Sequence, residues 1–402
     1  MAKTGPDTRQ LHRTVWVLGL VSLLMDVSSE MVHGLLPLFL VGTLGVSALT
    51  LGLIEGVAEG AASIAKIFSG ALSDRMSRRK PLIVLGYALS ALTKPLFPLA
   101  GSAATVFAAR FMDRIGKGIR GAPRDALIAD VTHAGDRGAA YGLRQSLDTV
   151  GAFAGPLLAV GLVVGLAYDI RAVLWFACIP ALLAVGVLLL GVVEAPRTAE
   201  RKAVARNPFA GFHRRDYPLR FWGLVGLVVL FTLTRFSEAF LILRAQDAGL
   251  STGWAPMTLV VMAATYLLTA YPAGRLSDRV SRHVLLALGC LVMVAADLLL
   301  AFGPSLAWVL AGVALWGVHM GLTEGVIAAL TADYAPENLR GSAFGIVNLA
   351  RGLMLLLASV LAGGLWTFFG PQATFLAGAG IAVLTAIAAL SLRTPLTARL
   401  DP

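Results

Sequence analysis

Ionisable side chains occur inside long apolar stretches of this sequence, where a charge is costly. The first stretch carries Asp26, Glu30 and His33, at a spacing that places all three on one face of a helix. If the stretch crosses a membrane, each such charge costs about 2.5–3.5 kcal/mol, so these residues are expected to line a cavity or to meet a partner. Two acids without a Lys or Arg in the same stretch must find a cation elsewhere or take up a proton. This pattern favours proton or cation binding.

Charged residues of this kind recur along the chain. The candidates for proton coupling or for a substrate cavity are Asp26, Glu30, Glu55, Glu59, Asp113, Arg114, Arg144, Asp148, Arg235, Glu238, His319, Glu324 and Arg351. Any of them can instead form an ion pair that only holds helices together. That structural interpretation is favoured for Arg144 and Asp148, which are one helical turn apart and can neutralise each other.

The stretches that hold these residues are typical of membrane helices. The chain is 57% hydrophobic and 14% charged, with a mean hydropathy of +0.79, unlike a soluble domain. Windows of about 20 apolar residues cross a bilayer as helix, whereas open strands leave backbone groups unpaired there. We therefore predict an all-α membrane protein. About twelve spans are expected, at 14–40, 48–72, 81–100, 104–128, 139–166, 171–193, 219–243, 254–275, 284–303, 306–332, 341–368 and 372–392.

The formal charge of +10 is distributed unevenly over the loops. Basic residues gather before the first span, at 75–80, in the connector 194–218 and at the C-terminus, whereas the loops at 41–47 and 303–305 carry no Lys or Arg. Cytoplasmic loops are enriched in Lys and Arg, so we expect a multi-pass protein of the cell (inner) membrane with both termini in the cytoplasm. The basic excess then needs no nucleic acid as partner.

A ten-residue segment is repeated at about half the chain length. Residues 70–79 read GALSDRMSRR, and residues 274–283 read GRLSDRVSRH, 204 positions later. Asp130 and Arg137 likewise correspond to Asp333 and Arg340, 203 positions later. Such repeats are typical of transporters built from two similar halves.

The repeat predicts two six-helix bundles. The expected boundaries are 1–193 for the N-terminal bundle, 194–218 for a cytoplasmic linker rich in charge and proline, and 219–402 for the C-terminal bundle.

The repeated loop resembles the Gly-x-Leu-x-Asp-Arg-x-x-Arg-Arg motif of the major facilitator superfamily, and the resemblance extends over essentially the whole chain. It implies that these loops latch a cytoplasmic gate. Gly70 and Gly274 would let helices approach closely, as small residues do in membranes. The residues expected to form the gate are Gly70, Asp74, Arg75, Arg78, Asp130, Arg137, Gly274, Asp278, Arg279, Arg282, Asp333 and Arg340.

Two further segments resemble motifs of the same family. Residues 110–116 read RFMDRIG and resemble Arg-x-x-Gln-Gly-x-Gly, with Asp113 and Arg114 in place of Gln and Gly. We expect Asp113 to be the neighbour that neutralises Arg114. Residues 151–156 read GAFAGP and resemble the Gly-x-x-x-Gly-Pro motif of antiporters, although its trailing glycines are absent. The second motif favours efflux.

The resemblance implies alternating access, with a site between the bundles that spans one, four, seven and ten line. The favoured function is proton-coupled export of a small organic compound, with the acids binding the proton. Arg114, Arg235 or Arg351 would bind the substrate. Proton-coupled uptake of an anionic metabolite is an alternative, since arginine binds carboxylate and phosphate.

Export of a divalent metal is a weaker alternative. Its ligands would be Asp26, Glu30, His33, His319 and Glu324. We expect no enzyme activity, no cofactor and no resident metal, because a nucleophile with its base, a phosphate loop and a thiolate cluster are all missing. Cys178 and Cys290 stand alone in apolar spans. The expected partners are a small-molecule substrate, protons and the lipid bilayer, with the protein as a monomer.

Overall fold

The structure, a computed structural model, describes residues 12–133, 136–165, 169–194, 216–277, 279–336 and 339–392. Every regular element in these ranges is a helix. The helices are α1 Arg13–Pro37, η1 Leu38–Thr43, α2 Ala48–Arg75, α3 Lys80–Thr93, α4 Leu96–Leu99, α5 Ala103–Val131, α6 Arg137–Val160, η3 Gly161–Gly165, α7 Ile170–Phe176, α8 Cys178–Gly191, α10 Leu219–Leu233, α11 Ala239–Asp247, η5 Thr252–Trp254, α12 Met257–Ser277, α13 Arg282–Phe302, α14 Leu306–Tyr334, α15 Arg340–Phe369 and α16 Pro371–Ser391.

The prediction of an all-α membrane protein is confirmed. Ten helical segments among the described residues are long and apolar enough to cross a membrane. The two remaining expected spans are helical but are not among these ten segments. The span at 104–128 is α5, which is long enough but carries many charges. The span at 219–243 is divided into α10 and α11, so the expectation of one continuous helix there was wrong.

The break between α10 and α11 covers residues 234–238. The hydroxyl of Thr234 donates a hydrogen bond to the carbonyl oxygen of Phe231 (2.7 Å). The backbone N–H of Ser237 donates to Ser359 Oγ on α15 (3.2 Å). Non-helical backbone at membrane depth is tolerated where protein groups satisfy it or where it lines a cavity. Arg235 and Glu238 lie in this break, so both project from irregular backbone.

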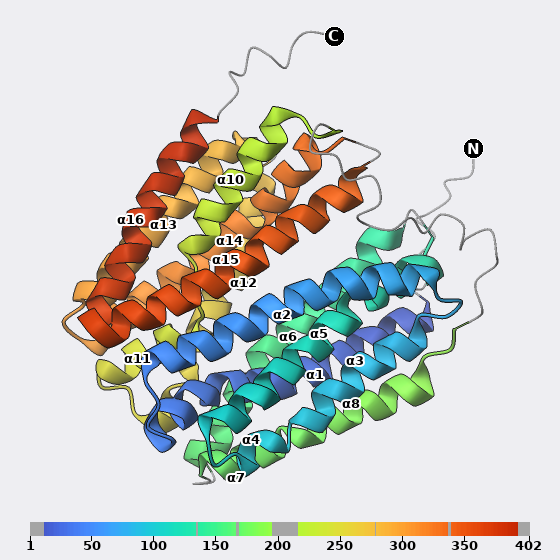
Figure 1. Ribbon diagram of the computed structural model, residues 1–402, viewed down its shortest axis with the longest axis horizontal. Helices are drawn as coiled ribbons and strands as arrows, with labels where there is room; N and C mark the ends of the chain where they lie inside the picture. The colour runs from blue at the N-terminus through green and yellow to red at the C-terminus, as the bar shows by residue number, and fades with distance from the viewer. Residues whose placement is uncertain are drawn as a thin grey trace, which may run out of the picture.

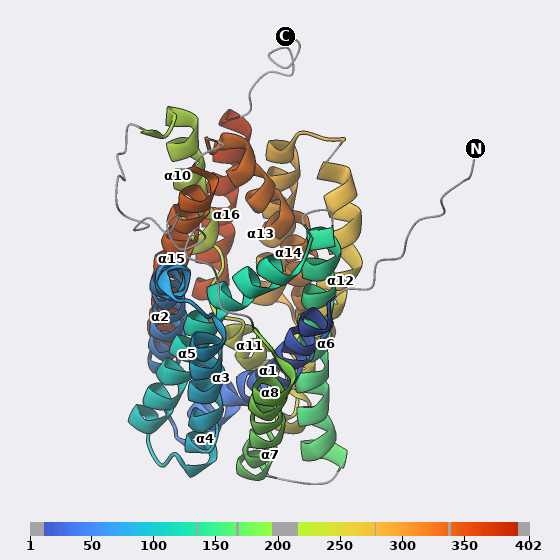
Figure 2. The same cartoon turned by 90° about the vertical axis from the view of Figure 1, so that its right-hand side faces the viewer.

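The helices form two groups (Figure 1). Helices α1 to α8, blue to green, make the N-terminal group, and α10 to α16, yellow-green to red, make the C-terminal group; Figure 2 shows the same division from the side. The groups meet mainly through α2 with α15, α6 with α12 and α1 with α11, and also through η3 with η5. We call the end of the molecule that carries residues 75–80 the basic end.

Glycines bring α2 and α15 together over only part of their length. A Cβ atom on Gly56 would stand 2.8 Å from the carbonyl oxygen of Leu356, and one on Gly352 would collide with Ser63. Small residues allow such close approach of helices in membranes. Nearer the basic end, a Cβ on Gly70 would meet Ala122 of its own group. The two groups therefore touch away from the basic end and part toward it.

Candidate functional site

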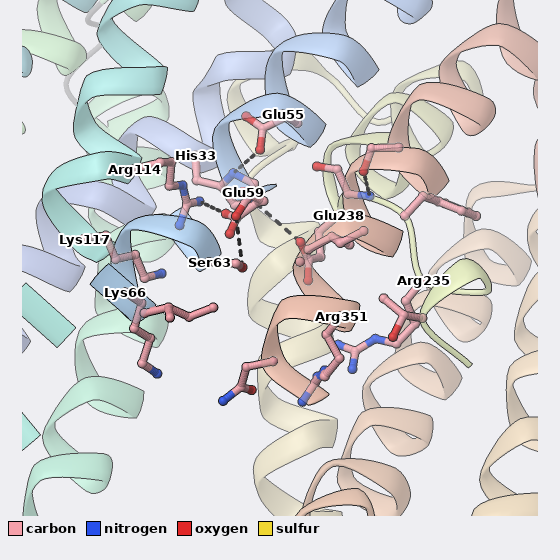
Figure 3. A pocket seen from close by; sticks show the side chains of 18 of the residues that line it. His33, Glu55, Glu59, Ser63, Lys66, Arg114, Lys117, Arg235, Glu238 and Arg351 are labelled. Atoms are coloured by element: carbon pink, nitrogen blue, oxygen red, sulfur yellow. Dashed lines mark hydrogen bonds and ion pairs between the residues drawn. The ribbon is translucent and has the colours of Figure 1, made fainter. Parts of the chain in front are cut away.

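A cavity of about 770 Å³ lies where the two groups part. It reaches from His33 and Glu238 to Asp74 on α2 and Phe344 on α15, near the basic end. Its ionisable lining residues are Glu30, His33, Glu55, Glu59, Lys66, Asp74, Arg114, Lys117, Arg235, Glu238 and Arg351. Figure 3 shows ten of the lining side chains with their labels. A cavity with charges of both signs is suited to a polar or charged ligand.

His33 of α1 connects the two groups at the closed end of this cavity. Arg110 Nη2 lies 2.9 Å from His33 Nδ1 and 2.8 Å from Glu55 Oε2. A guanidinium only donates hydrogen bonds, so Nδ1 accepts and the other ring nitrogen faces the C-terminal group. There His33 Nε2 lies 3.8 Å from Glu238 Oε2. The sequence places His33 on the acidic face of α1 but does not indicate this contact.

Arg114 pairs with Glu59 and not with Asp113. Its Nη2 lies 2.8 Å from Glu59 Oε1 on α2. Asp113 is buried and lies 3.1 Å from Nζ of Lys94, the residue that follows α3, with Arg110 at 4.0 Å. The expectation that Asp113 neutralises Arg114 was therefore wrong. Consecutive residues on a helix point about 100° apart, so the two side chains meet different neighbours.

Glu324 of α14 is shared by two arginines in the C-terminal group. Arg351 Nη2 lies 2.9 and 3.0 Å from its two oxygens, and Arg235 Nη1 pairs with one of them. The trio carries one positive charge in excess. The Arg351 side chain is 31% exposed, into the cavity. Guanidinium groups that share one carboxylate keep donors free for another oxyanion.

Asp26 and Glu30 have no ion pair within the described residues. Glu30 lines the main cavity and also a second, adjoining cavity of about 500 Å³. Asp26 lines only the second one, together with Arg144 and Asp148. Arg144 and Asp148 form the expected pair within α6 (2.7 Å). The two acids of α1 thus remain available for a proton or a cation.

His319 does not reach the cavity. It is fully buried, its Nδ1 lies 2.8 Å from the carbonyl oxygen of Gly289, and its ring stacks on Phe231 with centroids 5.4 Å apart. The expectation of His319 as a cavity residue was wrong, because Phe231 stands between it and the open space. No group of three or more His, Cys, Asp or Glu residues able to hold a metal ion occurs in the described part of the chain.

Comparison with known families decides the identity of the fold. The model of the Major Facilitator Superfamily matches residues 18–359 and, in a second match, 239–402. The chain belongs to this superfamily. It is therefore a multi-pass membrane transporter and not an enzyme.

Known members of the superfamily are similar over nearly the whole chain. An MFS-type transporter of Methanocaldococcus jannaschii is 32% identical over 396 residues, 96% of each chain. The multidrug resistance protein MdtH of Edwardsiella ictaluri is 27% identical over 86% of this chain and 84% of its own. The crystal structure of a POT family transporter in complex with 5-aminolevulinic acid superposes with a TM-score of 0.79 at 15% identity, covering 94% of this chain and 96% of that one.

The first superfamily loop is held together by Arg79. Its guanidinium lies 2.9 Å from Asp74 and 3.0 Å from Asp130, and it also donates to Ser73. Glu194 accepts hydrogen bonds from the backbone N–H groups of Arg79 and Lys80, at 2.7 Å each. Asp74 thus pairs within its own loop here and makes no ion pair with the described residues of the C-terminal group.

The remaining loop residues of the first copy face outward. Arg75 and Arg78 are exposed, and the exposed Arg137 donates to the carbonyl oxygen of Ala129 (3.4 Å).

The second copy of the loop differs from the first. Asp278 and the side chain of Arg340 lie outside the described residues. Arg282 pairs with Asp333, and Arg279 is exposed. No described atom would lie within 4 Å of a Cβ on Gly274, so the expected close helix approach at this glycine was wrong.

The second copy lacks the arginine that holds the first copy together. His283 stands where the first copy has Arg79, and its Nε2 meets the hydroxyl of Tyr334 (3.0 Å). A histidine ring has neither the reach nor the five donors of a guanidinium.

Proposed function

We propose that this transporter exports a small organic compound in exchange for protons by alternating access. Two bundles, residues 1–193 and 219–402, would move against each other about the cavity, joined by the linker 194–218. The observation that carries the proposal is Glu30, a carboxylate that lines the open cavity without a cationic partner among the described residues. Such a group can gain and lose a proton while the cavity is open.

The proposal assigns the two ligands to opposite walls. Glu30, with Asp26 beside it, would carry the proton on the N-terminal wall. Arg351, supported by Arg235, would bind a polar or anionic group of the substrate on the C-terminal wall, because its guanidinium is exposed to the cavity. Arg114 is a weaker candidate, since Glu59 already neutralises it.

Sequence similarity supports export as the direction. MdtH, named as a multidrug resistance protein, is similar over 86% of this chain, and residues 151–156 carry the antiporter-like motif. The Lys and Arg residues of the loops support a cytoplasmic orientation of the basic end, with the protein in the inner membrane. The cavity would then be open to the cytoplasm and ready to load a substrate for export. We propose that the protein works as a monomer.

Uptake of an anionic metabolite with protons is the second candidate. The observation that favours it is the number of cations in the cavity wall, where Lys66, Lys117, Arg235 and Arg351 all occur. Both candidates use the same acids and the same arginines. They differ in whether the proton and the substrate travel in opposite directions or together.

Transport in proteoliposomes separates the two candidates. Vesicles are loaded with ethidium or fluorescein, and release is followed after the external buffer is made acidic. Exchange for protons accelerates release, whereas symport slows it and drives accumulation instead. Glu30→Gln should abolish the response to the gradient but preserve exchange of compound at equal pH. Asp247→Asn, an exposed acid at the end of α11, is the matched control.

One result would contradict proton coupling at Glu30 and Asp26. If Glu30→Gln and the double variant with Asp26→Asn both keep the full response to the gradient, the proton binds elsewhere, and Glu55 with Glu59 becomes the next pair to test.

A further inference from the structure

We infer that the cavity binds an organic oxyanion, a carboxylate or a phosphate ester, between Lys66 and Lys117 of the N-terminal group and Arg351 of the C-terminal group, and that this anion is required for the basic end to close. The inference rests on the proposed transport function, because it takes the cavity as the transport path. It adds the substrate class and a condition on the conformational change.

The two lysines lie side by side on neighbouring helices. A Cβ atom on Gly121 of α5 would lie 3.7 Å from Cε of Lys66, so the Lys66 stem runs along α5 at this glycine. Lys117 is one helical turn before Gly121 on the same helix. Both lysines line the cavity and are exposed, and neither has an ion pair within the described residues.

Arg351 faces the lysines from the other group. The residue after it, Gly352, lies against Ser63 of α2, and Lys66 follows Ser63 by one helical turn. Arg351 therefore stands at the level where α2 and α15 begin to part. Asn348, one turn before Arg351, is exposed in the cavity and adds an amide donor. Figure 3 shows Lys66 and Lys117 on one side of the open space and Arg351 on the other.

Cations exceed acids at this level of the cavity. Arg351 and Arg235 share the single carboxylate of Glu324. The acid whose charge acts most strongly on Lys66 is Asp125, and Asp125 itself lies within 4 Å of two cations, Arg124 and Arg144. Of the other acids that line the main cavity, Glu59 pairs with Arg114 and Asp74 pairs with Arg79. Glu30, unpaired among the described residues, is one helical turn from His33 at the closed end. The part of the cavity between Lys66, Lys117 and Arg351 therefore carries an excess of positive charge that an anion could neutralise.

Closure would bring the cations of both groups together. Repulsion between like charges grows as they approach and as water leaves the space between them. An oxyanion between them reverses the sign of the interaction, since ammonium and guanidinium groups both donate to its oxygens. The empty carrier would then resist closing, and a bound anion would favour the closed state by differential binding. Neutral compounds would not provide this effect.

The test measures closure directly on the purified full-length protein in detergent. A cysteine placed at Ala71, which lines the cavity near the basic end, reports accessibility to a maleimide, and the native Cys178 and Cys290 are both buried. The probes are benzoate and benzamide, phenyl phosphate, and inorganic phosphate. Benzoate and phenyl phosphate should slow labelling and benzamide should not. If inorganic phosphate protects as well as the organic anions, the site takes free phosphate and the organic part of the inference is wrong.

Charge variants locate the effect. Lys66→Gln, Lys117→Gln and Arg351→Gln should each weaken protection about tenfold, the loss of one charge-assisted contact. Lys66→Arg should retain protection. Arg275→Gln removes an equal charge from α12 outside the cavity and should change nothing. If no oxyanion protects, if benzamide protects as well as benzoate, or if the three variants behave like Arg275→Gln, the inference is wrong.

The experiment uses no proton gradient, so its failure differs from failure of the proposed function. Anion-dependent protection without gradient-driven transport would reject the proton coupling and leave the anion site in place. Gradient-driven transport together with protection by neutral compounds would reject the anion site and leave the proton coupling in place.

Discussion

Gly155 of α6 lies against Glu30 of α1, so close that a Cβ atom on Gly155 would stand 2.8 Å from Cβ of Glu30. Gly151, one turn earlier, lies in the same way against Asp26, with 3.0 Å between the corresponding atoms. The glycines of the antiporter-like segment 151–156 thus form the surface on which both unpaired acids of α1 rest. This contact gives the motif a physical role, because the position of each acid depends on the absence of a side chain in α6.

The first prediction concerns this contact. Gly155→Ala should push α1 away from α6 and displace Glu30, at a cost of about 1–3 kcal/mol in unfolding free energy. Gradient-driven transport should fall by more than the stability loss explains. The control is Gly142→Ala on the same helix, where no described atom would lie within 4 Å of the new Cβ. Equal transport and equal thermal stability of the two variants would contradict the role of Gly155.

The second prediction concerns the buried pair Asp113 and Lys94. Asp113→Asn should leave the fully buried Lys94 without its counterion and destabilise the protein by about 3–5 kcal/mol. The double variant with Lys94→Met should recover most of that loss. Arg114→Gln should reduce the unfolding free energy by less, because its partner Glu59 is 28% exposed and its carboxylate can be solvated by water. Thermal unfolding in detergent measures all three, and a stable Asp113→Asn variant would refute the pairing as a determinant of stability.

The third prediction concerns the first loop. Among the described residues, Asp74 forms an ion pair only with Arg79, and Arg79 also pairs with Asp130. Asp74→Asn should therefore leave the fold intact. If Asp74 latches the closed form of the basic end, the variant should favour the open form, and labelling of the cysteine at Ala71 should rise about two- to fivefold, a shift of up to about 1 kcal/mol. Unchanged labelling with normal transport would exclude the latch.

The fourth prediction concerns the contact between His33 and Glu238, which joins the two groups at the closed end of the cavity. Glu238→Gln should weaken that contact and favour the state in which the closed end opens. Labelling at Ala71 should then fall, opposite to the effect of Asp74→Asn. Combining the two substitutions should bring labelling back toward the parent value. A rise in labelling with Glu238→Gln alone would show that this contact does not hold the present state.

Much of the fold could be predicted because the bilayer restricts the choices. Apolar stretches of about 20 residues can only be helices there, and this rule locates most of the membrane helices. The repeat of residues 70–79 at 274–283 similarly identifies two similar halves. Arg144 and Asp148 form the predicted pair because both members lie on one helix, where spacing alone sets the distance.

Tertiary structure decided which charges meet across helices. Asp113 pairs with Lys94, and Arg114 pairs with Glu59. Which residues face each other depends on how each helix is rotated about its axis, and glycine contacts and side-chain packing fix that rotation. The break at 234–238 was equally hidden, because apolar residues flank it on both sides in the sequence, while one of its supports, the hydroxyl of Ser359, comes from another helix. Sequence determined which residues are costly to bury, and packing of the helices determined which of them remain without a partner in the cavity.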